Sequence, residues 1–208
     1  MDLSSPPYRM ETARLSLRPW AAGDAPLWCA AVGASAGHLR DGFVPFMEGE
    51  PRDEGQAVSL LRGYRAAFER DELHRFAVFE RESGEMVGET MLIARVGPEA
   101  LELGYWTHAD HCRKGFAVEA GAAMLWLAFR IHRGVDRVEV QHVTPDNDKS
   151  GAVAARLGFK REATLRRRIS LPGGRRADCA LWSVFAHEYE ARGAPPTAFN
   201  ALGADMVA

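Results

Sequence analysis

The segment HCRKGFAVEAGAAMLWLAFR, residues 111–130, constrains the fold of this chain more than any other. It places two cations and a glycine directly before an apolar run from Ala120 to Phe129 that only Gly121 interrupts. The run is too short to cross a bilayer, so it predicts a helix buried in the core of a folded domain. A chain of 208 residues is long enough to form such a core within one large domain.

Strand patterns surround this helix on both sides along the chain. Alternation of apolar and polar residues, together with β-branched and aromatic side chains between turns, is typical of half-buried strands. Such patterns occur at 13–20, on both sides of the turn ESGE within 74–96, at 99–108, at 135–143, and at 159–171 and 177–189 across the turn PGGRR.

Three further helices are predicted from periodicity and capping. The best defined covers 56–71, where apolar residues recur every three or four positions, namely Val58, Leu61, Tyr64 and Phe68. Asp24 is a candidate cap for a helix over 25–34, and a helix within 145–158 is expected to end at Gly158. Glycines and prolines among mixed residues at 38–55 predict a loop.

This order of elements predicts an α/β fold in which helices cover both faces of a mixed sheet. We expect a single domain over residues 1–191. Because the periodic pattern ends near residue 192, we expect 192–208 to form a mobile tail.

Composition excludes several classes of protein. The net charge of −2 gives no global attraction to nucleic acid, although arginines cluster at 156–168. Three cysteines at wide spacing, Cys29, Cys112 and Cys179, predict neither a disulfide framework nor a metal site. The N-terminal residues lack the basic-then-apolar order of a signal peptide, so we expect a cytoplasmic protein that does not bind membranes.

The turn before the apolar helix is a candidate phosphate site. A helix N-terminus exposes backbone N–H groups and a partial positive charge, and a glycine lets a ligand approach the backbone closely. Gly115 and the small Ala117 meet these needs, and Arg113 and Lys114 add positive charge. The alternative is that Gly115 only permits a turn while both cations face solvent.

Several segments in the same order resemble one family. The strand LELGYW, the turn HADHCRKGFAVEA and the helix segment PDNDKSGAVAARLGF are similar to the acetyl-coenzyme A core of the GNAT superfamily of N-acyltransferases. More narrowly, together with METARLSLRPW near the N-terminus, they resemble the ribosomal-protein α-amino (Ser/Ala) acetyltransferases over roughly residues 10–190.

The resemblance implies a mostly antiparallel sheet with a V-shaped cleft between two central strands. It also implies acetyl-CoA as co-substrate, no metal, and a primary-amine acceptor, either a protein N-terminus or a small molecule. A homodimer is compatible with it. By position, the residues expected to bind the coenzyme are Trp106, Thr107, Cys112, Arg113, Lys114, Gly115, Phe116, Ala117, Asn147 and Ser150. Cys112 departs from the usual Gln or Arg, but most contacts there are made by backbone.

For catalysis the resemblance points to Glu102 as a base that acts directly or through water, with an arginine-paired structural glutamate as the alternative. His142 and His108 are other candidate bases. A tyrosine acid found in other members is replaced by Ala154 or Ala155, so the acid is unassigned, with Ser150 and water as candidates.

Asp178 also matches a recurrent aspartate of the closing strand, where an arginine-paired structural role is favoured over catalysis. The segment 24–70 and the hairpin RRRISLPGGRR are expected to form the acceptor side.

Two alternatives to an enzyme remain at this point. The missing tyrosine and Cys112 are compatible with a non-catalytic acyl-CoA-binding regulatory domain. The arginine-rich hairpin is compatible with a nucleic-acid-binding accessory protein, which the net charge disfavours.

Overall fold

The computed structural model describes residues 6–40, 53–193 and 200–202. Within these residues nine strands form one mixed, mostly antiparallel sheet in the order β7-β8-β6-β5-β4-β3-β2-β1-β9. Their bounds are β1 Arg9–Glu11, β2 Leu15–Pro19, β3 Leu73–Glu80, β4 Met86–Ile93, β5 Ala100–Thr107, β6 Arg137–Thr144, β7 Lys160–Ser170, β8 Arg176–Phe185 and β9 Asn200–Leu202. The predicted α/β sheet is therefore confirmed.

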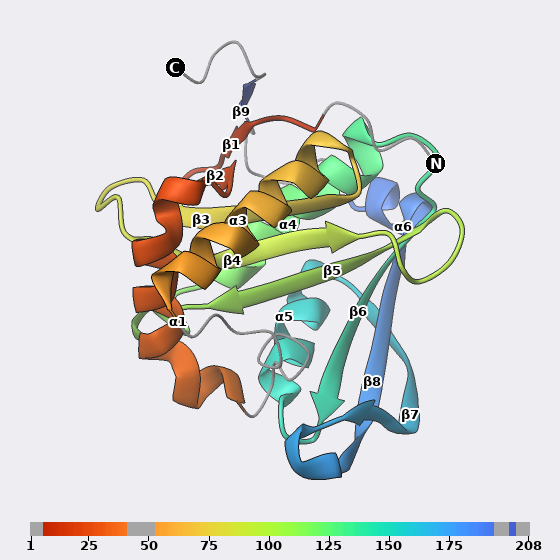
Figure 1. Cartoon of the computed structure of the whole chain (residues 1–208). Coiled ribbons are helices and arrows are strands. Elements are labelled where there is room, and N and C mark those ends of the chain that lie inside the picture. Colours follow the sequence, from red (N-terminus) through yellow and green to blue (C-terminus); the bar gives the residue numbers. More distant parts are fainter. Residues whose placement is uncertain (1–5, 41–52, 194–199, 203–208) are drawn as a thin grey trace.

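Helices cover both faces of this sheet, as predicted (Figure 1). The main helices are α1 Ala25–Arg40, α3 Glu54–Glu69, α4 Phe116–Trp126, α5 Asp148–Leu157 and the short α6 Ala186–Ala191. Strand β3 shows how the faces divide, because successive side chains of a strand point in opposite directions. Ala77 joins the buried cluster under α1 and α3, whereas Phe76 and Val78 join the cluster under α4.

Helix α4 is the buried helix that the apolar run predicts. Ala123, Met124 and Leu125 are almost completely buried, and a π-helical turn, Leu127–Ile131, continues it. At Gly121 a side chain would place its Cβ 2.6 Å from Cδ1 of Leu157, so the glycine allows α4 and α5 to pack closely. No helix among the described residues is long and apolar enough to span a membrane.

Strands β5 and β6 form the parallel pair at the centre of the sheet. Their pairing runs from Ala100 and Arg137 to Glu102 and Glu139 and then ends. Beyond this point β5 pairs with β4, and β6 pairs with β8, while the two strands diverge (Figure 1). The divergence produces the V-shaped cleft that the resemblance implies.

Some local expectations were incomplete. Helix α1 extends to Arg40, so residues 38–40 of the predicted loop are helical and 41–52 lie outside the described residues. The carboxylate of Asp24 accepts hydrogen bonds from the backbone N–H of Ala21 and the guanidinium of Arg18 rather than from the first turn of α1.

The chain ends also contain pairing that no pattern predicted. Residues 200–202, within the segment 192–208 expected to be a tail, form β9 and pair with the three-residue strand β1. Strands of three residues are too short to show an alternating pattern, which is why neither was anticipated. The division into a domain at 1–191 and a tail stays a prediction.

Candidate active site

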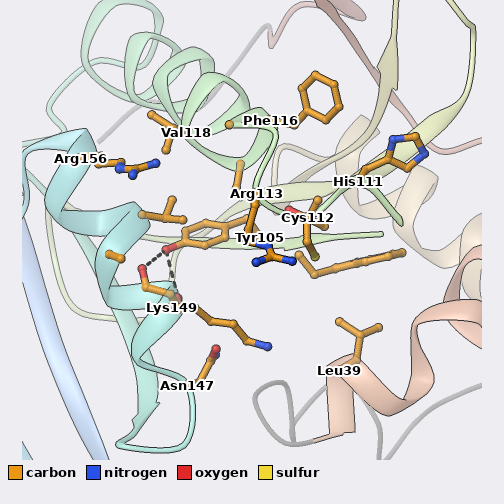
Figure 2. A pocket seen from close by; sticks show the side chains of 17 residues that line it. Leu39, Tyr105, His111, Cys112, Arg113, Phe116, Val118, Asn147, Lys149 and Arg156 are labelled. Carbon is orange, nitrogen blue, oxygen red and sulfur yellow. Dashed lines mark hydrogen bonds between the residues drawn. The ribbon is translucent and has the colours of Figure 1, made fainter. Parts of the chain in front are cut away.

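A cavity of about 300 Å³ lies beside the N-terminus of α4, bounded by α5 and the end of β5 (Figure 2). Nine of the ten residues expected to bind the coenzyme line it: Trp106, Thr107, Cys112, Arg113, Gly115, Phe116, Ala117, Asn147 and Ser150. We call this the coenzyme cavity. Lys114 is outside the lining; its ammonium lies 3.3 Å from Nδ1 of His111.

The turn before α4 has the backbone geometry of an anion site. Gly115 has a φ of 85° and precedes Phe116, the first residue of the helix. Arg113 has a φ of 64°, a left-handed conformation that non-glycine residues seldom adopt. The first N–H groups of α4 are therefore presented at the cavity, where helix geometry and partial positive charge favour phosphate.

Arg14, from the segment between β1 and β2, holds this turn in place. Its guanidinium donates to Oε2 of Glu119 at 2.7 Å and to the carbonyl of Lys114 at 3.0 Å, and it lies 4.8 Å from the ring centre of Phe116. Burial alone would raise the pKa of Glu119, but hydrogen bonds from Thr12 and Arg14 hold that pKa below its ordinary value. The turn is thus fixed by a charged pair that the sequence analysis did not identify.

Cys112, the departure from the family pattern, has the character of a structural thiol. Its Sγ lies 3.5 Å from the carbonyl oxygen of His108. Burial raises the pKa of the thiol, against the lowering effects of Lys149 and Arg113. A thiol that stays protonated is a poor nucleophile, so a structural role suits this half-buried side chain.

Two cations that the sequence analysis missed complete the coenzyme cavity. Lys149, at the start of α5, extends across the cavity toward the side on which Leu39 lies (Figure 2). Arg156 lies at the far end of α5 near Val118. Both lie on the helix that follows Asn147, so their sequence positions beside this predicted coenzyme-binding residue could have indicated their role.

A second cavity of about 260 Å³ opens in the cleft between β5 and β6. We call it the acceptor cavity. It shares Tyr105, Asn147 and Ser150 with the coenzyme cavity, so the two meet at these three side chains. Its remaining lining comes mainly from β3, β4, β5 and β6.

Tyr105 and Ser150 form the hydroxyl pair at this meeting point. The Tyr105 hydroxyl donates to the backbone carbonyl of Ser150 at 2.8 Å and lies 3.1 Å from Ser150 Oγ (Figure 2). Burial raises the pKa of Tyr105 to about 12. Ser150 therefore lies where a proton donor is expected, and the Tyr105 hydroxyl holds it there. The resemblance pointed to a tyrosine only on the helix, at the positions of Ala154 or Ala155, whereas Tyr105 comes from β5.

Glu102 lines the acceptor cavity, but both of its carboxylate oxygens are engaged. Each accepts a hydrogen bond of 2.6 Å from Arg95, and this bonding raises the pKa of the arginine. The pair is the structural alternative foreseen in the sequence. A base role therefore requires that Arg95 move or that a water carry the proton from the amine to the carboxylate.

Further charge is buried beside the acceptor cavity. Arg75 lines the cavity, and its Nε donates to Oε1 of Glu89 at 2.6 Å, while Trp20 donates to Oε2 at 2.6 Å. Arg75 also lies 4.0 Å from the ring centre of Tyr64. This network links the cavity to α3, within the segment 24–70 expected on the acceptor side.

The other candidate groups are held in structural contacts. Trp182 donates to Nε2 of His142 at 3.1 Å, which leaves Nδ1 to donate to the carbonyl of Val143 at 2.8 Å. His108 accepts from the backbone N–H of Asp110 and is outside both cavities. Asp178 accepts from the backbone N–H of Arg167 at 2.8 Å rather than from a side chain.

The sheet, the splayed strands and the two cavities that meet between them define an acetyltransferase fold. The chain belongs to the acetyltransferase (GNAT) domain family, whose model matches residues 14–160.

Several proteins are similar to this chain. The "uncharacterized N-acetyltransferase YoaA" of Bacillus subtilis (strain 168) is 27% identical over 118 residues, which cover 53% of this chain and 62% of that protein. Among solved structures, Mycobacterium smegmatis RimJ in complex with CoA-disulfide is 25% identical, with a TM-score of 0.75 over 90% of this chain and 96% of that chain.

A "putative ribosomal-protein-serine acetyltransferase" from Vibrio cholerae is 24% identical, with a TM-score of 0.70 over 87% of this chain and 99% of that chain. At this identity the likeness concerns the fold.

Proposed function

We propose that this chain is an acetyl-CoA-dependent N-acetyltransferase that acts on a primary amine, with the α-amine of a protein N-terminus as the favoured acceptor. The observation that carries the proposal is that two cavities meet at Tyr105, Asn147 and Ser150. A donor and an acceptor that enter from opposite sides can react only where such cavities join. The ribosomal-protein relatives support the choice of a protein α-amine.

The coenzyme cavity suits the chemistry of acetyl-CoA. The pyrophosphate would bind to the first N–H groups of α4, and Arg113, Lys149 and Arg156 provide cations along the cavity wall. The pairing of β5 with β6 ends at Glu102 and Glu139, and the end of β5 at Trp106 and Thr107 lines the coenzyme cavity, so this strand suits an extended pantetheine arm.

The reaction we propose is direct transfer. The amine nitrogen attacks the thioester carbonyl carbon, a C–N bond forms, and the C–S bond breaks. Glu102 receives the amine proton through a water, and Ser150 donates a proton to the departing thiolate. No covalent acyl-enzyme is needed, and burial raises the pKa of the Cys112 thiol, which disfavours the thiolate that would form one.

The function is tested in two stages. Thermal unfolding with acetyl-CoA at a hundredfold excess over Kd should show a stabilisation of about 2.7 kcal/mol. Thiol release from acetyl-CoA is then measured with peptides that begin with Ser, Ala or Met and with small amines. Stabilisation without thiol release from any acceptor would favour the acyl-CoA-binding regulatory domain. If acetyl-CoA produced no stabilisation, both functions would be wrong.

A further inference from the structure

Strand β7 carries three consecutive exposed arginines on a bulge. Between Leu165 and Ile169 its pairing with β8 shifts register, and Arg166, Arg167 and Arg168 lie in the interval. Arg167 has a φ of 51°, and its N–H donates to Asp178 on β8. Asp178 therefore stabilises a bulge whose effect is to present guanidinium groups to solvent.

Two more arginines face this bulge across the turn of the hairpin. Arg175 contacts Asp146 at 3.2 Å, and Arg176 donates to the hydroxyl of Ser170. We call residues 166–176 the arginine hairpin. Its five arginines outnumber the two aspartates, Asp146 and Asp178, that contact it, so its net charge is positive. It extends beyond the carboxyl end of β6 (Figure 1).

A groove connects the arginine hairpin with the acceptor cavity. Arg168 lines it together with Arg95, Glu102, Glu139 and Gln141. Three of these residues, Arg95, Glu102 and Gln141, also line the acceptor cavity, so the groove and the cavity adjoin.

The carboxylates of this groove are already neutralised by partners. Glu102 is paired with Arg95 at 2.6 Å, and Glu139 is paired with Arg137 at 2.8 Å. Arg168 has no ion pair within the described chain. The groove therefore becomes more positive as it runs from the acceptor cavity toward the hairpin.

We propose that this groove selects acceptors whose reacting amine is followed by carboxylate side chains, that is, acidic peptide N-termini. The proposal rests on the proposed function, since it names the acceptor class of that site. A peptide that places its α-amine at Ser150 can extend along the groove, where Arg168 and its neighbours bind Asp or Glu side chains by bidentate, charge-assisted hydrogen bonds.

A peptide fits these features better than a nucleic acid. Residues 160–178 contain no aromatic side chain on which a base could stack, and the whole chain carries a net charge of −2. The groove also adjoins the acceptor cavity through Arg95, Glu102 and Gln141, where an acceptor must lie.

The test compares two peptides that begin with Ala and differ only at positions three to six, which are Asp and Glu in one and Asn and Gln in the other. We expect a KM for the acidic peptide about tenfold lower at low salt, and a smaller difference at high salt because exposed charges are screened. Arg168→Gln should remove most of that advantage. Arg161→Gln, on the same strand outside the hairpin, is the matched control and should keep it.

Anisotropy of the labelled peptides provides a second readout that does not depend on turnover. If no amine is acetylated but the acidic peptide still binds more tightly, the acceptor groove stands and the proposed function fails. Equal KM and Kd for both peptides, or equal effects of Arg168→Gln and Arg161→Gln, would overturn the proposal. It would equally be overturned if oligouridylate bound more tightly than the acidic peptide and lost that binding in Arg168→Gln.

Discussion

The coenzyme cavity and the acceptor cavity touch at three residues but are built in different ways. The first is formed by the N-terminus of α4, the helix α5 and the end of β5, and its central feature is a turn with defined backbone geometry at Gly115. The second draws its side chains from several strands and contains the pair of Arg95 with Glu102, while Arg75 on its wall pairs with Glu89. A site made of backbone can be found from a local motif, whereas a site made of paired charges depends on which distant strands become neighbours.

The largest effect should come from the charged pair of the acceptor cavity. If Glu102 receives the amine proton, Glu102→Gln should lower kcat by about 10²–10³-fold with little change in the KM for acetyl-CoA. Arg95→Gln frees the carboxylate and should retain turnover. Steady-state kinetics across pH check both.

A matched control for this pair is Glu72→Gln, because Glu72 is likewise paired with an arginine, Arg70, but is outside both cavities. It should retain full activity. If Glu102→Gln is inactive but the double variant Arg95→Gln with Glu102→Gln recovers, Glu102 is a structural partner and the base assignment is wrong.

The hydroxyl pair where the cavities meet should give the next largest effect. Ser150→Ala is expected to lower kcat by about 10²-fold, because the thiolate loses its proton donor. Tyr105→Phe keeps the ring but removes the hydrogen bond to Ser150, and should lower kcat by about tenfold through poorer positioning. Single-turnover rates measure the chemical step directly.

Ser59→Ala serves as the control for this pair, since Ser59 is a helical serine on α3 that lines neither cavity. A Tyr105→Phe enzyme slower than Ser150→Ala would make the tyrosine the donor. That result would contradict the assignment of Ser150 as the proton donor.

A smaller effect is expected on the coenzyme side. Arg14→Ala removes the contacts to Glu119 and Lys114, so the turn before α4 should become less ordered. We expect the KM for acetyl-CoA to rise about tenfold, equivalent to about 1.4 kcal/mol, with kcat nearly unchanged. Arg18→Ala is the control, because Arg18 is paired with Asp24 away from the cavity. A loss in kcat with unchanged KM would show that Arg14 does not act through the turn.

The smallest effect on activity is expected from the buried pair of His74 and His132, because neither residue lines the coenzyme cavity or the acceptor cavity. Burial lowers the pKa of His74 to about 4. Its Nδ1 lies 3.0 Å from Nε2 of His132, its Nε2 lies 3.5 Å from Asp71, and the ring of Phe68 packs against it. Between about pH 6.5 and pH 4 the unfolded chain binds more protons at this site, so the free energy of unfolding should fall as pH falls.

Urea unfolding at pH 7 and pH 5 measures this change, which is expected to be about 2 kcal/mol at most from His74. His74→Leu should reduce it, and His187→Leu, which replaces an exposed histidine on α6, should not. Equal pH dependence in both variants would assign the change to other groups. At pH 7 both variants should bind acetyl-CoA as the unchanged protein does.

Local patterns predicted most of the fold and most of the coenzyme cavity. The apolar run identified α4, and its preceding glycine identified the turn, because both depend on residues close together in sequence. Arg14 could not be found this way, since its partners Lys114 and Glu119 are about a hundred residues away. Strands β1 and β9 were missed because three residues show no period.

The acceptor cavity was predicted only as a region. Glu102 was recognised, but its pairing with Arg95 depends on the turn between β4 and β5. Tyr105 was overlooked as a polar group because its strand reads as apolar, and only the approach of α5 brings its hydroxyl to Ser150. The sequence alone therefore predicted where the strands lie along the chain and which residue types they carry. The structure was needed to show which elements contact one another in the cavity.

The early end of pairing between β5 and β6 has a consequence for self-association. Open strand edges usually invite neighbouring chains, and proteins protect them with charges, bulges or covering segments. Here the ends of β5 and β6 beyond their mutual pairing line the two cavities, and Ser150 of α5 lines both cavities as well. These edges therefore lie within the molecule's own cleft, where a bound extended chain could pair with them. A strand edge that would otherwise promote association between copies is thus placed where a molecule must enter the cleft to pair with it.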